Sequence, residues 1–224
     1  MKQVKVITAQ EAALLVKDND VVASNGFVGS VQPEALTSAL EARFLETGAP
    51  RDLTLIYAAS QGNSDGRGGD HFAHEGMLKK AILGHWNAVT ALQKLVNANK
   101  IQAYNLPQGT LAQYFRDVAA HRVGTITHVG LETFADPRVS GGRLNDVTTE
   151  DFVKVIQIDG KDQLFYPRMD INVALIRGTY ADEWGNVVLT KEIAPLDATS
   201  IAQAAHNSGG TVIVQVEKIV KGGM

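Results

Sequence analysis

A loop with unusual backbone freedom lies at residues 24–33, where SNGFVGSVQP places two glycines, a phenylalanine and a proline after an apolar run. Gly26 and Gly29 allow the main chain to take positive φ angles or to approach a ligand closely. The helix expected after Pro33 offers unpaired N–H groups to an anion or a developing oxyanion. The glycine spacing differs from the G-x-G-x-x-G pattern of dinucleotide-binding loops. A simple strand-to-helix turn explains this loop equally well, so the residues alone leave both interpretations open.

Carboxamide side chains occur in two further loops, QGNSDGRGGD at residues 61–70 and LPQGT at residues 106–110. Gln108 can donate and accept hydrogen bonds where a strand ends and a helix begins, so it can orient a substrate amide or carboxylate. Gln61 and Asn63 follow another strand in a comparable way. In an open parallel sheet, ligands bind beyond the carboxyl ends of the strands, where such loops gather. Helix capping and solvation are the alternative roles for these side chains.

The histidines form no recognisable catalytic or metal-binding motif. His71 and His74 have i, i+3 spacing with Glu75 beside them, but no clear third ligand is present, so helix packing is their expected role. We expect His85 and His121 to lie at the edge of the core or at helix ends. The sequence contains no HExxH, Walker loop, GxSxG elbow or evident carboxylate pair. These residues predict a small-molecule site but do not identify a reaction.

The elements that must position these loops alternate between strand and helix. Thr8 and Glu11 have capping-box spacing, which predicts a helix to about Lys17. We expect a strand at residues 21–24, and a helix with Pro33 at its first position that Gly48 ends. Further strands are expected at residues 53–59, 81–84, 101–105, 125–130, 171–178 and 211–220, and further helices from near His71 and at residues 89–100, 112–121 and 196–210.

This alternation predicts an α/β fold, an open and mostly parallel sheet flanked by helices. Residues 151–167 differ from it, because they predict a β-hairpin around Asp159 and Gly160 that is inserted into the α/β pattern. We find no linker rich in proline, serine or charge, and no repeat of fixed period. Residues 1–224 are therefore expected to form one domain.

Composition limits the classes of function. The chain has 224 residues, 45% of them hydrophobic, with 21 Lys and Arg against 24 Asp and Glu, and no cysteine. Without a basic run, nucleic acid is not an expected partner. The absence of cysteine excludes disulfides, thiolate zinc sites and a cysteine nucleophile. We find neither a signal peptide nor a membrane span, so a cytoplasmic location is expected.

The loop motifs together resemble a known family. GFVGSVQPEAL is similar to the signature of family I CoA-transferases, usually close to GGFGxxGxPxxL, and the likeness is greatest to the propionate and acetate CoA-transferase branch. It extends over essentially the whole chain, including RFLETGAPRDLTLIYAASQGNSDGRGGDHFAHEG, GHW, AYNLPQGTL and DINVALIRGTYADEWGN. Asn25 and Val31 depart from the signature, because each stands at a glycine position.

The resemblance implies a mechanism. In this family a glutamate carboxylate attacks an acyl-CoA thioester, and the resulting anhydride is converted into a glutamyl-CoA thioester that a second carboxylic acid resolves. Coenzyme A is a substrate, and no metal or redox cofactor is needed. The nucleophilic glutamate lies in the family's C-terminal half, whereas this chain resembles the N-terminal, α-type half. We therefore expect neither Glu75 nor Glu132 to be the nucleophile.

The resemblance also implies a composite site. We expect a β-type partner half to bring the glutamate and most CoA contacts, in a hetero- or homo-oligomer. This chain would contact the acyl-CoA and the small carboxylic acid through a set of pocket residues, with Gln108 as the best-supported member. The expected substrate-binding residues are Gly26, Phe27, Val28, Gly29, Gln61, Asn63, Gln108 and Gly109.

Three other classes of function remain open. By resemblance, sugar-phosphate isomerases and the ligand-sensing domains of transcriptional regulators share the same order of strands and helices. An isomerase would need a carboxylate and usually a lysine over a sugar phosphate, and a sensor would need an attached DNA-binding segment. Neither is visible in the sequence. The chain could also be a non-catalytic assembly subunit or a fragment.

Overall fold

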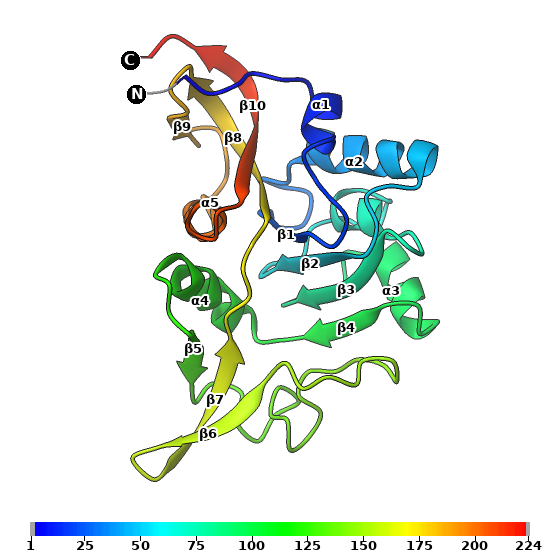
Figure 1. The fold of residues 1–224 in the computed structure, drawn as a ribbon, viewed down its shortest axis with the longest axis vertical. Helices are drawn as coiled ribbons and strands as arrows, with labels where there is room; N and C mark the ends of the chain where they lie inside the picture. The colour runs from blue at the N-terminus through cyan, green and yellow to red at the C-terminus, as the bar shows by residue number, and fades with distance from the viewer. Residues whose placement is uncertain (1–2, 223–224) are drawn as a thin grey trace.

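The computed structural model describes residues 3–222 and is built around one large sheet (Figure 1). Its strand order is β10-β8-β1-β2-β3-β4, and the pairs along this order are parallel, whereas the short β9 pairs antiparallel with β8. The mostly parallel α/β architecture that the sequence predicts is therefore confirmed. The strands are β1 (Val21–Ser24), β2 (Leu53–Tyr57), β3 (Leu78–Leu83), β4 (Gln102–Asn105), β8 (Val173–Asp182), β9 (Val187–Val188) and β10 (Thr211–Val220).

Helices cover both faces of this sheet. On one face lie α1 (Ala9–Ala13), α2 (Glu34–Thr47) and α3 (Thr90–Asn97); on the other lie α4 (Gln108–Ala119) and α5 (Ala198–Asn207), which pack against each other. Burial of both faces explains why β2 is apolar along nearly its whole length and buried at every position. Within residues 3–222, no helix has the length and apolarity that a bilayer crossing requires.

A second, three-stranded antiparallel sheet lies beyond β4 at the bottom of Figure 1. It has the order β5-β7-β6 and comprises β5 (Gly124–Thr127), β6 (Lys154–Ile158) and β7 (Lys161–Pro167). The predicted hairpin is confirmed, because Asp159 and Gly160 join β6 to β7 with φ angles of 49° and 71°. Two successive positive φ angles match a turn that follows the twist of the strands.

The prediction that residues 125–130 continue the parallel sheet is wrong. Their strand β5 leaves the large sheet and pairs antiparallel with β7. The position beside β4 is taken instead by a loop: Asn105 donates its amide to Gly142 O at 2.8 Å, and Leu144 donates to Ala103 O at 3.0 Å. Backbone hydrogen bonds of β4 are thus satisfied by an irregular segment.

The predicted ends of α1 and α2 agree in part with the observed ends. Both hydrogen bonds of the Thr8–Glu11 capping box form, although α1 ends at Ala13 rather than near Lys17. Pro33 precedes the first helical residue of α2, and Gly48 ends that helix with a φ of 71°. A capped start and a left-handed glycine are strong signals in the chain.

The expected helix from near His71 is wrong, and α4 begins earlier than expected, at Gln108. The segment Gly68–Phe72 is one 3-10 turn, η1, and an irregular chain leads from it to β3. A helix that starts near His71 cannot continue through Gly76, whose φ angle is 89°.

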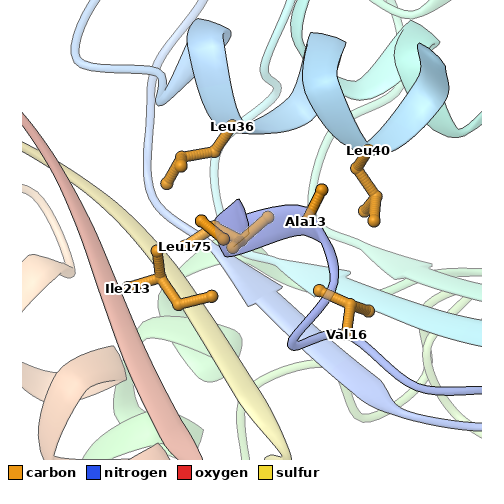
Figure 2. Close-up of a pocket in the computed structure, with 7 residues that line it drawn as sticks. Ala13, Val16, Leu36, Leu40, Leu175 and Ile213 are labelled. Atoms are coloured by element: carbon orange, nitrogen blue, oxygen red, sulfur yellow. The ribbon is translucent and has the colours of Figure 1, made fainter. Parts of the chain in front are cut away.

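A small apolar cavity of about 10 Å³ lies where α1, α2, β8 and β10 meet (Figure 2). Leu36 and Leu40 of α2 point down into it, and Val16 closes it beside α1. Its remaining lining residues are Ala12, Ala13, Leu175 and Ile213. Because the lining is apolar, α2 is held on the sheet by the burial of these side chains.

We predict that Leu40→Ala lowers the free energy of unfolding by about 2–5 kcal/mol, because Leu40 is 1% exposed and its removal enlarges a cavity. Leu45→Ala on the same helix is the matched control. Leu45 is 65% exposed, so its change is expected to stay within about 0.5 kcal/mol. Urea unfolding measures both, and equal losses would contradict this packing of α2.

Candidate active site

The loop after β1 and the loop after β2 meet at the carboxyl ends of the parallel strands. The amide of Val28 donates to Ser60 O at 2.6 Å, and the amide of Gly62 donates back to Val28 O at 2.9 Å. These bonds form a short parallel bridge between Val28 and Gln61. Two of the three predicted loops are therefore brought together, at the edge where open α/β sheets bind ligands.

Positive φ angles occur in the first loop at valines. Val28 has a φ of 51° and Val31 a φ of 60°, whereas neither Gly26 nor Gly29 lies in the left-handed region. At Gly26 the surroundings are tight, since a Cβ there would lie 3.1 Å from Gln61 Cγ and from Gln32 Cα. A β-branched residue in the left-handed region is strained, and the bonds to Ser60 and Gly62 compensate for that strain at Val28.

The departure from the signature at Asn25 has a structural role. Asn25 is 1% exposed. Its side-chain Nδ2 donates to Pro195 O at 3.4 Å, and its Oδ1 accepts from Asp197 N at 3.1 Å. Glycine could make neither of these bonds. Asn25 therefore ties the first loop to the start of α5, and burial raises the pKa of the Asp197 carboxyl there.

Gln61 and Asn63 differ in how they are placed. The carboxamide of Gln61 is buried and paired at both ends with Ser24: Nε2 donates to Ser24 O at 2.8 Å, and Oε1 accepts from Ser24 Oγ at 2.7 Å. The Gln61 side chain thus joins the ends of β1 and β2, and the main-chain carbonyl of Gln61 accepts the amide of Gly69. Asn63 is exposed.

Gln108 is the first residue of α4 and is exposed, as is Gly109. The N-cap, Pro107, forms no side-chain capping bond, so the first-turn amides of α4 have no cap from that residue. Gly84, at the end of β3, sets the position of this helix start. A Cβ on Gly84 would lie 2.2 Å from Ala58 O and 2.9 Å from Gln108 Cα.

These contacts place all three loops along one edge. Ala58 borders Gly84 beside Gln108, and Ser60, two residues further on, binds Val28. Within the described residues, Ser60 Oγ and Asn105 Oδ1 are buried and lack a hydrogen-bond partner. Phe27 and Val28 contribute apolar side chains that are 45% and 41% exposed. Apolar side chains at the same sheet edge as a carboxamide and helix amides are groups of the kind that bind a small acyl group and orient its carbonyl or carboxylate.

A network of carboxylates and imidazoles supports the second loop. His71 contacts Glu41 Oε2 through Nδ1 at 2.6 Å and Glu34 Oε1 through Nε2 at 2.8 Å. Glu34 Oε2 also accepts the amide of Gly68 at 3.0 Å, and Glu41 Oε1 contacts His74 at 2.6 Å. Burial lowers the pKa of His71, but the two carboxylates outweigh burial and the net pKa is raised.

The other candidates lie apart from this edge or face solvent. Glu75 is exposed and pairs with Lys100 at 3.2 Å. Glu132 has a φ of 61° and lies in the loop between β5 and β6, where its amide binds Asp136. His121 follows α4 and contacts Arg168 at 3.2 Å. His85 is exposed beside Gly84, at the carboxyl edge itself.

Sequence reasoning missed several residues that build this edge. Glu34 is the first residue of α2 and Glu41 lies about two turns further along it, and a charged residue at such a position is usually solvent-exposed. The GHW motif carries Gly84, whose need for close packing depends on two segments distant in the sequence. The signal available for Glu34 and Glu41 was their i, i+7 spacing, which places two carboxylates on one face of α2.

Comparison with known proteins finds similarity to coenzyme A transferases. The family model described as Coenzyme A transferase matches residues 6–224. Acetate CoA-transferase YdiF of Escherichia coli K12 is 40% identical over 220 residues, which are 98% of this chain and 41% of that protein. This chain thus spans less than half the length of that relative. The acetate CoA-transferase subunit alpha of the same organism is 27% identical over 183 residues, 82% of this chain and 74% of the subunit.

A solved structure is similarly close. The acyl-CoA transferase YdiF of Escherichia coli O157:H7, described as a thioester complex with CoA, superposes with a TM-score of 0.96 at 40% identity. The match covers 98% of this chain and 45% of that chain.

We predict that Gly84→Ala lowers the free energy of unfolding by about 1–3 kcal/mol, because the added methyl group overlaps Ala58 O and the start of α4. Gly109→Ala, where no atom lies within 4 Å of the added Cβ, is expected to be neutral or to stabilise by up to about 1 kcal/mol. Thermal unfolding of both variants tests this, and a neutral Gly84→Ala would argue against the close approach.

We also predict that His71 makes stability depend on pH. Because its folded pKa is raised, the contribution of His71 to stability is fully present below the unfolded pKa of about 6.5 and is lost as the pH rises through the folded value. His71→Gln should flatten this part of the curve, and His206→Gln, on the exposed side of α5, should leave it unchanged. Urea unfolding between about pH 5 and 9 measures how the free energy of unfolding changes with pH. The same change in wild type and His71→Gln would contradict this role of His71.

Proposed function

Because this chain belongs to the coenzyme A transferase family, we propose that it forms one wall of a site that exchanges CoA between a short-chain acyl-CoA and a carboxylic acid such as acetate. The observation that carries the proposal is the meeting of the Val28 loop, the end of β2 and Gln108 along one sheet edge. Acetate is suggested as an acid because two relatives are described as acetate CoA-transferases.

The proposed reaction passes through a glutamate carboxylate. Its oxygen attacks the thioester carbonyl, CoA leaves as a thiolate, and an acyl-glutamyl anhydride forms. The thiolate then attacks the glutamyl carbonyl, which releases the first carboxylate and leaves a glutamyl-CoA thioester. The second acid takes over CoA by the reverse steps. This exchange requires neither a metal nor a redox cofactor.

Residues of this chain would act by binding and by excluding water. The carboxamide of Gln108, in the first turn of α4, would hydrogen-bond the acyl carbonyl or the incoming carboxylate. Phe27 and Val28 would cover the reacting carbonyl with apolar surface. Exclusion of water matters here because hydrolysis of either thioester or of the anhydride would waste the activated acyl group.

We assign the nucleophilic glutamate to a partner polypeptide. Glu75 is paired with Lys100, and Glu132 lies in the loop of the second sheet, so neither is placed to attack at the carboxyl edge. A partner is suggested by the relative described as the acetate CoA-transferase subunit alpha, a name that implies a further subunit. A β-type half would supply the glutamate and most CoA contacts.

We predict that the isolated chain does not exchange CoA between acetyl-CoA and propionate, and that the complex with its natural partner does. In that complex, Gln108→Ala is expected to lower kcat/KM by about 10- to 100-fold through loss of one hydrogen bond to the reacting group. Native mass spectrometry establishes the partner's stoichiometry, and a coupled thioester assay measures exchange. Turnover by the isolated chain would refute the division of the site between two polypeptides.

A further inference from the structure

The chain of side chains Glu34, His71, Glu41 and His74 connects two parts of the carboxyl edge that are distant in sequence. Glu34 is the first residue of α2, directly after the loop that carries Val28. His71 belongs to η1, the continuation of the loop that begins at Gln61. The network therefore links the two loops from behind, outside the strand-end residues that would contact substrate.

The geometry requires His71 to donate from both ring nitrogens. Each nitrogen lies 2.6 or 2.8 Å from a carboxylate oxygen, and an ionised carboxylate offers acceptors alone. A neutral imidazole can donate to just one of these two carboxylates. Two good bonds therefore require the imidazolium.

Glu34 transmits this requirement to the loop. One of its oxygens contacts His71, and the other accepts the amide of Gly68. Gly68 is packed closely against neighbouring atoms, since a Cβ there would lie 2.4 Å from Gln32 Oε1 and 2.7 Å from Gln61 O. The adjacent Gly69 donates its amide to Gln61 O at 2.7 Å. A shift of the Glu34 carboxylate would thus move Gly68 and, with it, the main chain of Gln61 beside Val28.

The charged groups around His71 are mostly acidic. Glu34 and Glu41 face it from α2, and Asp70 lies beside it on η1. From α3, the amides of Ala91 and Leu92 donate to Asp70 Oδ1 at 3.0 and 3.2 Å. Among the described groups in contact with these carboxylates, the other histidine is His74, whose Nε2 lies 2.6 Å from Glu41 Oε1. Loss of the His71 proton would leave three carboxylates close to a neutral ring.

We propose that His71 is a positioning residue of CoA transfer: as an imidazolium between Glu34 and Glu41, it fixes Gly68 and holds the loop after β2 against Val28. This inference rests on the proposed function. Its consequence is that deprotonation loosens residues 61–70 and lowers the rate of transfer, without a direct contact between His71 and substrate.

Substitution at position 71 in the complex with the partner half tests this role. With His71→Gln, a carboxamide can still donate to Glu34, but its oxygen faces the Glu41 carboxylate. We expect hydrogen exchange of the 61–70 segment to quicken by about 10-fold or more relative to the rest of the chain. We expect kcat to fall by about 10- to 100-fold with little change in KM, because the loop is displaced rather than the binding contacts removed.

The pH profile gives an independent readout. In the wild-type complex, kcat should fall as the pH rises through the pKa of His71, and in His71→Gln this fall should be absent. His206→Gln, which changes a histidine on the surface of α5, is the matched control and should retain both the wild-type profile and the wild-type exchange rate.

A double variant separates positioning from general damage to the fold. In His71→Gln combined with Glu41→Gln, the carboxamide at position 41 can donate to the oxygen at position 71, so that an uncharged network is restored. We expect kcat and exchange protection of residues 61–70 to recover by at least about fivefold over His71→Gln, with no dependence on the histidine proton.

Two results would overturn the inference: wild-type kcat and loop exchange in His71→Gln, or a double variant no better than the single one. Loss that is uniform over all peptides would also overturn it, because it would assign His71 to global stability. Absence of CoA exchange in the wild-type complex would instead count against the proposed function, and this outcome is visible before any variant is compared.

Discussion

The hydrogen bond of 2.6 Å from the amide of Val28 to the carbonyl of Ser60 is the contact on which the carboxyl edge of the sheet depends. It holds a valine in the left-handed region, where the side chain is strained, and so fixes the direction in which Phe27 and Val28 face. Strain of this kind persists when surrounding structure determines the conformation. Here the determinants are the bond to Ser60, the return bond from Gly62 and the anchoring of Asn25 to the start of α5.

Local signals in the sequence predict much of the fold because they act over a few residues. The Thr8–Glu11 capping box, the left-handed Gly48 and the Asp159–Gly160 turn are each determined by neighbours in the chain, and each is present. The alternation of strands and helices predicts a parallel sheet, because each helix returns the chain to the end of the sheet where the previous strand began. The pairing partner of residues 125–130 could not be predicted. It depends on which segment hydrogen-bonds to the edge of β4, and in the structure that segment is the loop at residues 142–144.

The sequence predicts where the candidate site lies, but not the role of each side chain in it. Loops that follow parallel strands must meet at one edge, so Val28, Gln61 and Gln108 could be grouped before their geometry was known. The role of each side chain depends on partners far away in sequence. Gln61 is hydrogen-bonded to Ser24, and the carboxylates of Glu34 and Glu41, about two turns apart on α2, both contact His71. The i, i+7 spacing places the two carboxylates on one face of α2, but no local pattern indicates that they meet His71, which explains why helix packing was the expectation for His71.

The loop that covers β4 has a consequence for how molecules of this protein meet in solution. A bare outer strand presents a row of amides and carbonyls that can recruit a strand from a second molecule, and repetition of that event produces aggregates. At β4 the groups of Ala103 and Asn105 are already engaged by Leu144 and Gly142. Gly142, with a φ of 74°, turns the covering segment away from an extended path. This flank therefore terminates the sheet instead of serving as a template for its growth.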